Sequence, residues 1–166
     1  MPTRIRWQDG QAVLAEDPFT HVADELELAS GDVILSLTRF QAEGERLLYE
    51  GRKVGVRLDS HEEVEALAYD LPRISVVALD FPKFRDGRAY TNARLLRERF
   101  AYAGEVRAVG DVLLEQAGFM LRCGFDAFEP ADGSSPQAWT AAAHRFRHVY
   151  QRAADRRTPA FEVRGA

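Results

Sequence analysis

Short apolar runs recur along the central part of the chain, and a segment with helical periodicity follows each run. The runs are rich in β-branched and aromatic residues and lie at 33–37, 54–58, 74–79, 106–109 and 125–128. The first three begin about 20 residues apart, a spacing typical of strand–helix units in a parallel sheet. The pattern predicts one α/β domain over residues 1–166, with a βα-repeat core at 32–153.

Capping signals predict where the following helices begin and end. Ser60 and Glu63 form a capping box ahead of one helix, and Gly104 is suited to end the next. Asp111 is placed to cap a third helix, which Gly124 would terminate.

The last helix has a clear start, where Ser135 is followed by a proline. Its apolar face continues at helical spacing as far as Ala153. We expect the tail, 155–166, to be loosely ordered, and Phe161 and Val163 could add an edge strand to the sheet.

The N-terminal residues, 1–18, are predicted to form a β-hairpin. Asp9 and Gly10 separate two alternating segments and can supply the positive φ angles of a tight turn. Residues 19–31 are acidic and weakly periodic, so we expect a short helix or a loop there.

Five strands joined by helices predict a mainly parallel sheet with right-handed connections. Two shapes satisfy this prediction, a doubly wound open sheet and a half-barrel with its strands in sequence order. The near-uniform repeat favours the half-barrel. Both shapes place function at the C-terminal ends of the strands. A half-barrel leaves open sheet edges, so we also expect a homodimer or a partner protein to cover them.

Composition excludes several classes of protein. A net charge of −4 argues against a nucleic-acid-binding domain. No apolar run approaches the length of a membrane span or of a signal-peptide core, so we expect a cytoplasmic protein. Cys123 is the single cysteine and excludes an internal disulfide. No glycine-rich phosphate loop or redox motif occurs, and no cofactor is expected.

Charge is distributed unevenly along the chain. Residues 81–110 hold seven basic and three acidic side chains, a net charge of +4. Residues 11–50 hold nine acids and two arginines, a net charge of −7. The central segment is therefore expected to meet a small anion or an acidic partner.

The loop 80–88 combines basic and aromatic side chains, which together can hold an oxyanion or a carboxylate. The following helix repeats basic residues on one side, which indicates either a solvated face or a docking face for an acidic protein. The candidate anion-binding or docking residues are Lys83, Arg85, Arg88, Tyr90, Arg94, Arg97 and Arg107.

Arg107 interrupts a short apolar strand and has two interpretations. If its side chain enters the covered face of the sheet, it needs an anionic partner, such as Asp80, Asp126 or a bound ligand. If it lies at an outer rim, it pairs with Glu98 or Glu105 and keeps its charged end in water.

Asp80, Asp111 and Glu129 stand at the ends of three successive predicted strands. Three such carboxylates could hold Mg²⁺ in a half-barrel enzyme. Against this interpretation, Asp111 also serves as a helix cap, and no lysine or histidine at a following strand end could act as a base. We therefore expect these acids to be partners of the basic residues rather than a metal site.

Three sequence blocks together resemble one bacterial family. They are FRDGRAYTNARLLRERF at 84–100, GEVRAVGDVL at 104–113 and RCGFDAFE at 122–129. Over roughly residues 30–130 the chain resembles the family called domain of unknown function 934. Genes of that family are typically found beside those for assimilatory sulfite reductase, and its members are often called oxidoreductases of sulfite reduction.

The resemblance implies a part in reducing sulfate or sulfite for cysteine synthesis, and two roles remain open. In the first, an accessory protein docks through the face at 88–97 on the sulfite reductase or its electron donor, because complementary charge speeds encounter. In the second, a small enzyme or sensor binds an oxyanion such as sulfite at the basic loop. Since no motif implies a redox cofactor, we favour the accessory role.

Overall fold

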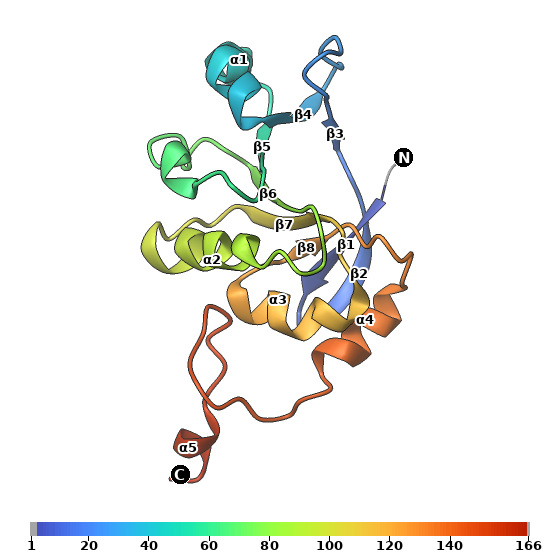
Figure 1. Cartoon of the computed structure of the whole chain (residues 1–166), viewed down its shortest axis with the longest axis vertical. Helices are drawn as coiled ribbons and strands as arrows, with labels where there is room; N and C mark the ends of the chain where they lie inside the picture. Colours follow the sequence, from blue (N-terminus) through green and yellow to red (C-terminus); the bar gives the residue numbers. More distant parts are fainter. Residues whose placement is uncertain (1–2, 166) are drawn as a thin grey trace.

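The computed structural model of the chain describes residues 3–165, so Met1, Pro2 and Ala166 of the predicted hairpin and tail lie outside it. Eight strands form one sheet in the order β2-β1-β8-β7-β6-β5-β4-β3, curled into a half-barrel (Figure 1). The strands are β1 (Thr3–Gln8), β2 (Gln11–Glu16), β3 (Phe19–His21), β4 (Asp32–Ser36), β5 (Val54–Leu58), β6 (Val76–Phe81), β7 (Glu105–Gly110) and β8 (Ala127–Phe128).

Strands β3 to β8 are parallel and follow one another in sequence order, which confirms the half-barrel and not the doubly wound sheet. Right-handed connections that all advance in one direction place the helices on one face of the sheet. The helical segments are α1 (Leu37–Tyr49), η1 (Val64–Leu67), α2 (Arg88–Arg94), η2 (Leu95–Arg99), η3 (Leu114–Gln116), α3 (Ala117–Cys123), α4 (Pro136–Ala143) and α5 (Ala160–Val163).

The curl of the sheet follows from the short link between its two edge strands. β2 ends at Glu16 and β3 begins at Phe19, so these two Cα atoms lie at most about 11 Å apart. In a flat sheet the outer two of eight strands would be about 34 Å apart. The sheet must therefore curl until its edges approach at this end.

The N-terminal hairpin is confirmed. β1 pairs antiparallel with β2 around a turn in which Asp9 has φ 49° and Gly10 has φ 79°. The prediction for 19–31 was wrong in its first residues, because Phe19–His21 is a strand that pairs with β4. Phe19 is buried on the concave face of the sheet, and this tertiary contact stabilises a strand that local periodicity did not indicate.

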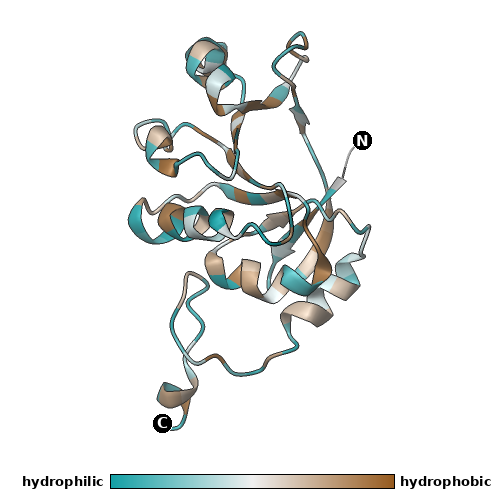
Figure 2. Cartoon of the chain, in the orientation of Figure 1, coloured by the Kyte–Doolittle hydropathy of each residue, from teal (hydrophilic) through white to brown (hydrophobic). Residues whose placement is uncertain are grey.

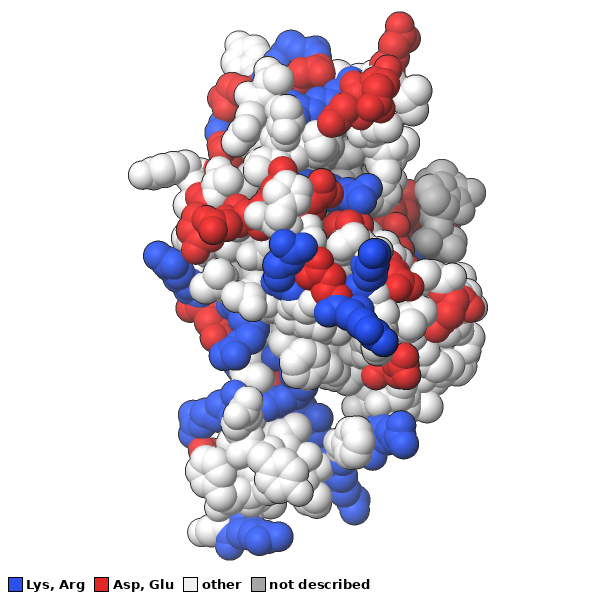
Figure 3. Space-filling view, in the orientation of Figure 1, with Lys and Arg blue, Asp and Glu red and all other residues white. Residues whose placement is uncertain are grey.

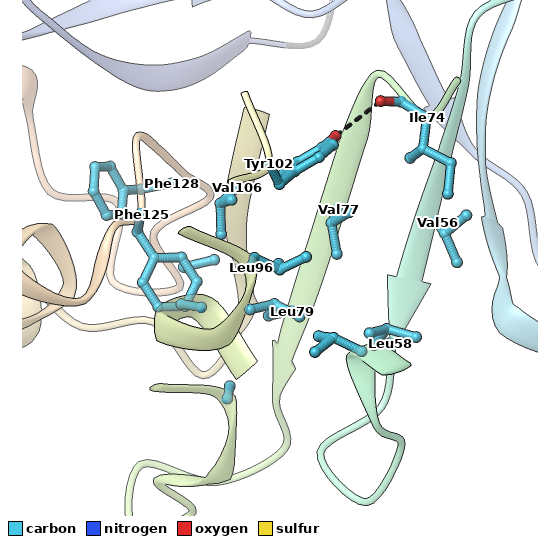
Figure 4. Packing of buried hydrophobic residues seen from close by; sticks show 14 of the residues in the cluster. Val56, Leu58, Ile74, Val77, Leu79, Leu96, Tyr102, Val106, Phe125 and Phe128 are labelled. Carbon is cyan, nitrogen blue, oxygen red and sulfur yellow. Dashed lines mark hydrogen bonds between the residues drawn. The ribbon is translucent and has the colours of Figure 1, made fainter. Parts of the chain in front are cut away.

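The main core lies between the sheet and its helices. Along β6, Val77 and Leu79 join this core, whereas Val76 and Ala78 face the concave side. Figure 4 shows Val77 and Leu79 beside Leu96 of the helical layer. Polar and apolar residues alternate along residues 105–108 of β7 (Figure 2), because Glu105 and Arg107 lie on the same face of the strand.

Two predicted helix ends differ in the structure. Glu63 and not Ser60 precedes η1, and no side chain caps it, so the capping box was wrong. α2 continues into the π-helical segment η2, which ends at Arg99 with Phe100 as its cap, and the following Ala101 takes φ 49°. Gly104 therefore does not end that helix.

The helix predicted to begin at Asp111 begins later, with η3. There the Leu113 N–H donates to the side chain of Gln116 at 3.0 Å, so Asp111 is not the cap. Gly124 ends α3 with φ 103°, as predicted.

α4 begins as predicted, with the Ser135 hydroxyl accepting from the Ala138 N–H at 3.2 Å. It ends at Ala143 rather than at Ala153, because the apolar side chains beyond that point find no surface to pack on. Residues 144–165 leave the body as an extended segment, which we call the C-terminal arm (Figure 1). Its residues Phe161 and Val163 belong to the short helix α5 and not to an edge strand.

Candidate functional site

The parallel strands end at one rim of the half-barrel, where the loop 82–87 leaves β6. We call this segment the rim loop. The Phe84 N–H donates to the carboxylate of Asp111 at 2.7 Å, which ties the rim loop to the end of β7. Lys83 and Arg85 are exposed, and neither forms an ion pair with another residue of 3–165. The rim loop therefore presents two uncompensated positive charges.

Arg88 lies at the start of α2, beside the rim loop, and is already paired. Its guanidinium donates to Asp86 at 2.6 Å and to the Ser60 hydroxyl at 2.8 Å. The hydrogen bond from Arg88 holds the pKa of the Asp86 carboxyl far below its ordinary value. Figure 3 shows basic and acidic side chains next to one another over α2 and the loop before it.

Arg94 and Arg97 have different surroundings, although both were predicted on one basic face. Arg94 is exposed and forms an ion pair with Glu98, one helical turn away, at 3.2 Å. Arg97 donates to the backbone carbonyls of Gly124 at 2.9 Å and Tyr102 at 2.7 Å. Arg97 therefore holds the ends of two helices together and is not displayed to a partner.

Tyr90 belongs to an aromatic cluster and not to the basic face. Its ring lies 5.1 Å from Phe81 and 4.6 Å from Phe119, both at steep angles. Burial raises the pKa of the Tyr90 hydroxyl to about 12. The residue positions α2 against α3, and its side chain is partly buried rather than displayed as a docking contact would be.

Arg107 is fully buried on the concave face of the sheet, with 0% of its surface exposed. Its guanidinium donates to Asp17 at 2.6 Å, to Glu105 at 2.7 Å and to Glu129 at 2.8 Å. Burial alone would lower the pKa of Arg107, but the hydrogen bonds and charges of these three acids outweigh burial and keep it above its ordinary value. The interpretation that places Arg107 inside with anionic partners is thus the right one.

Asp80 and Asp126, the predicted partners of an inward Arg107, were wrong. Glu129, predicted as an acidic partner of the basic residues, does pair with Arg107. Asp80 instead accepts from Arg57 at 2.9 Å, and Asp126 accepts from the Val106 N–H at 2.8 Å. Glu105 was expected as a partner only for an exposed Arg107, but in the structure both side chains are buried on the concave face of the sheet.

Arg4 completes the buried group, which we call the inner ion cluster: Arg4, Asp17, Glu105, Arg107 and Glu129. Arg4 donates to Glu105 at 2.9 Å and lies 3.6 Å from Asp17. Sequence analysis did not include Arg4 or Asp17. The one available signal was the alternation of arginines along the first strand, which puts two of them on the same face.

His21 was also missed, and it connects the inner ion cluster to solvent. Its Nε2 lies 2.9 Å from the carboxylate of Glu129, which follows β8 on the other side of the half-barrel. Because His21 ends the edge strand β3, this contact brings together two parts of the rim that a flat sheet would separate.

A pocket of about 460 Å³ opens at the C-terminal ends of β3, β4 and β5. Its lining holds one arginine, Arg57, and three acids, Asp24, Asp59 and Glu62. Arg57 is compensated by Asp80, whose pKa is raised by burial although Arg57 acts in the opposite direction. The pocket is therefore acidic on balance.

The three rim carboxylates have separate partners. Asp80 pairs with Arg57, Asp111 accepts from the rim loop, and Glu129 pairs with Arg107. Within residues 3–165, no group of three or more His, Cys, Asp or Glu side chains is placed to hold a metal ion.

The fold and the rim together define the class of protein. It is an α/β half-barrel with a basic surface beside the C-terminal ends of its strands, and its buried charges are paired with one another. The chain belongs to the family described as "Bacterial protein of unknown function (DUF934)", whose model matches residues 55–161. This match confirms the resemblance seen in the three sequence blocks. A comparison with curated proteins gave no significant match. Among the helices of 3–165, none combines the length and the apolar character needed to cross a membrane.

Proposed function

We propose that this protein is an accessory protein of assimilatory sulfite reduction that docks on sulfite reductase or its electron donor. The docking surface is the basic rim: Lys83, Arg85, Arg88 and Arg94. The family resemblance implies the pathway, and the exposure of Lys83 and Arg85 without an acidic partner in 3–165 is the observation that carries the proposal. The proposal implies a cytoplasmic protein.

The alternative, a pocket for a small oxyanion, has less support. It needs Arg88 and Arg107 to converge with Asp80, but Arg88 lies at the surface and Arg107 is neutralised inside the half-barrel. The pocket beside the rim has more acids than bases, which repels sulfite or sulfate.

A protein partner suits the rim loop better. Exposed positive charges steer an acidic surface into contact, and Phe84, 45% exposed between Lys83 and Arg85, offers an apolar anchor. The bond from Phe84 to Asp111 fixes the loop in place, so little order has to be gained on binding.

The test is the affinity of the purified protein for sulfite reductase, and separately for its electron donor, measured by calorimetry. We expect Lys83→Glu with Arg85→Glu to weaken binding at least about tenfold, and added salt to weaken binding by the native protein. The control pair, Lys53→Glu with Arg99→Glu, makes the same charge change away from the basic rim and should stay within about twofold.

If the native protein binds neither partner, or if both variant pairs lose affinity equally, the docking proposal fails. Titration with sulfite serves as a second control. Tight binding of sulfite that depends on Lys83 and Arg85 would favour the oxyanion role instead.

A further inference from the structure

The C-terminal arm presents a basic and aromatic surface that the rest of the described chain does not cover. Its 22 residues, 144–165, hold six arginines and two acids, a net charge of +4 with neutral histidines. Phe146, Tyr150 and Phe161 are 69%, 88% and 66% exposed. Three exposed aromatic rings in so short a segment mark an interaction surface.

Most of the positive charge of the arm is uncompensated. Arg152 pairs with Glu162 at 2.5 Å, and Arg157 donates to the backbone carbonyl of Phe146 at 3.1 Å. The remaining arginines form no ion pair with any residue of 3–165, and they are Arg145, Arg147, Arg156 and Arg164.

The arm has a defined course. The Ala154 N–H donates to the carbonyl of Arg122 at 3.1 Å, and the Arg122 side chain pairs with Asp155. Within the arm, the Ala160 N–H donates to the carbonyl of Val149 at 2.7 Å. These bonds fix the arm to the end of α3 and hold its aromatic side chains outward, so little conformational entropy is lost when a partner binds.

A surface of opposite character lies at the other end of the molecule. The loop 23–29 between β3 and β4, which we call the acidic loop, carries Asp24, Glu25 and Glu27 and no basic residue. Leu26, between two of these acids, is 61% exposed. Figure 1 draws the acidic loop at the top and the arm at the bottom. Figure 3 shows acidic atoms beside some basic ones at the top, and mostly basic atoms around the arm.

We propose that the C-terminal arm binds the acidic loop of a second copy of this chain. The two surfaces match in charge, and each carries exposed apolar side chains that the other can cover. Because they lie at opposite ends of the long axis, an arm cannot reach the acidic loop of its own chain. Two antiparallel copies make both contacts at once, in the twofold arrangement that is commonest among oligomers.

This interface is separate from the basic rim, so the two proposals can fail independently. Lys83→Glu with Arg85→Glu should leave self-association unchanged, and the variants below should leave the basic rim intact.

The first measurement is sedimentation of the native chain over a range of concentrations. We expect a reversible dimer whose dissociation constant rises at least about tenfold between about 50 mM and about 500 mM salt, because salt screens the charged contacts. Substitution of Phe146, Tyr150 and Phe161 by serine should weaken the dimer by a similar factor. Circular dichroism should show an unchanged fold, because all three side chains are exposed.

A charge swap provides the decisive test. Arg147→Glu with Arg156→Glu, or Glu25→Lys with Glu27→Lys, should each weaken the dimer at least about tenfold. The four substitutions together bring the arm from +4 to 0 and the acidic loop from −3 to +1. The substituted positions of arm and loop again carry opposite charges, so the chain that carries all four should regain part of the lost affinity. An equimolar mixture of the two double variants should not dimerise more tightly than the four-substitution chain does.

A native chain that stays monomeric at high concentration overturns the proposal. So does a dimer that the arm substitutions leave unchanged, or a four-substitution chain that is not rescued. Retention of a short RNA by the native arm, with no self-association, would assign the arm to nucleic acid instead and likewise refute the proposal.

Discussion

At the scale of single residues, Glu129 is held in its charged form by two neighbours, His21 and Arg107. Burial by itself would raise the pKa of Glu129. The hydrogen bond and charge of His21, together with those of Arg107, outweigh burial and keep the pKa below the ordinary value of 4.5. This carboxylate therefore connects the buried arginine of the inner ion cluster with a histidine at the solvent-facing rim.

The lowered pKa of Glu129 predicts an acid-sensitive contribution to stability. A carboxyl whose pKa is lower in the folded than in the unfolded chain stabilises the fold above its unfolded pKa. That contribution disappears as the pH falls through the folded pKa. The native chain should therefore be more stable than Glu129→Gln near neutral pH, and the difference should shrink as the pH falls below 4.5.

Urea unfolding of both chains at several pH values measures this difference. Asp111→Asn removes a half-buried carboxylate that accepts a hydrogen bond from the rim loop and serves as the comparison. A difference between the native chain and Glu129→Gln that stays constant, or grows, in acid would contradict the assignment.

At the scale of elements, the helix ends are set by close contacts as much as by local preference. Gly124 ends α3 with φ 103°, and a Cβ atom there would lie 2.5 Å from Cγ of Arg97. Arg97 cannot easily move away, because its guanidinium donates to the carbonyl of Gly124 itself. Arg97 therefore holds the C-terminal end of α3 against the π-helical segment η2.

Substitution of Gly124 by alanine should destabilise the fold by about 3 kcal/mol, since the left-handed backbone and the crowded Cβ both act against it. Gly31→Ala is the matched control. Gly31 has φ 85° but nothing within 4 Å of its Cβ position, so only the backbone effect of about 1 kcal/mol remains. Equal losses in thermal unfolding would show that the contact with Arg97 is not decisive.

At the scale of the whole molecule, the inner ion cluster joins parts of the sheet that the curl brings together. Arg107 lies on β7, in the middle of the sheet, whereas Asp17 lies on the link between the edge strands β2 and β3. The ion pair between them spans the concave side and is buried at both ends. This ion pair therefore stabilises the curled shape of the half-barrel.

Substitution of Arg107 by methionine should destabilise the fold by about 3–5 kcal/mol, because buried carboxylates lose their cation. Arg94→Met removes an exposed pair with Glu98 and should change stability by no more than about 0.5 kcal/mol. Adding Asp17→Asn to Arg107→Met should recover part of the loss, because one unpaired charge is removed. If Arg107→Met proves no more costly than Arg94→Met, the cluster does not stabilise the fold.

Local signals predicted much of this fold. Asp9 and Gly10 determined the hairpin turn, and the strand at 54–58 was predicted to the residue, because both depend on neighbouring residues. The last helix was predicted ten residues too long. Its apolar spacing continues beyond Ala143, but a helix persists only where its apolar face is packed, and the spacing does not show that.

The candidate site was harder to predict. The members of the inner ion cluster come from β1, the β2–β3 link, β7 and the residue after β8. No spacing along the chain indicates that such distant segments meet. The exposed side chains of the rim loop were easier to find, because Lys83 and Arg85 follow a predicted strand directly and their exposure requires no distant contact.

The sequence by itself determined the alternation of strands and helices in the core and membership of the family, because these depend on local periodicity and on residue identity, and it favoured the half-barrel over the doubly wound sheet. Only the tertiary structure decided how each charged residue is used. Arg107 is neutralised inside, whereas Lys83 and Arg85 are exposed and form no ion pair with another residue of 3–165. Whether an arginine of a strand is buried depends on whether its side chain lies on the concave face of the curled sheet. The sheet curls only because a short link joins its two edge strands.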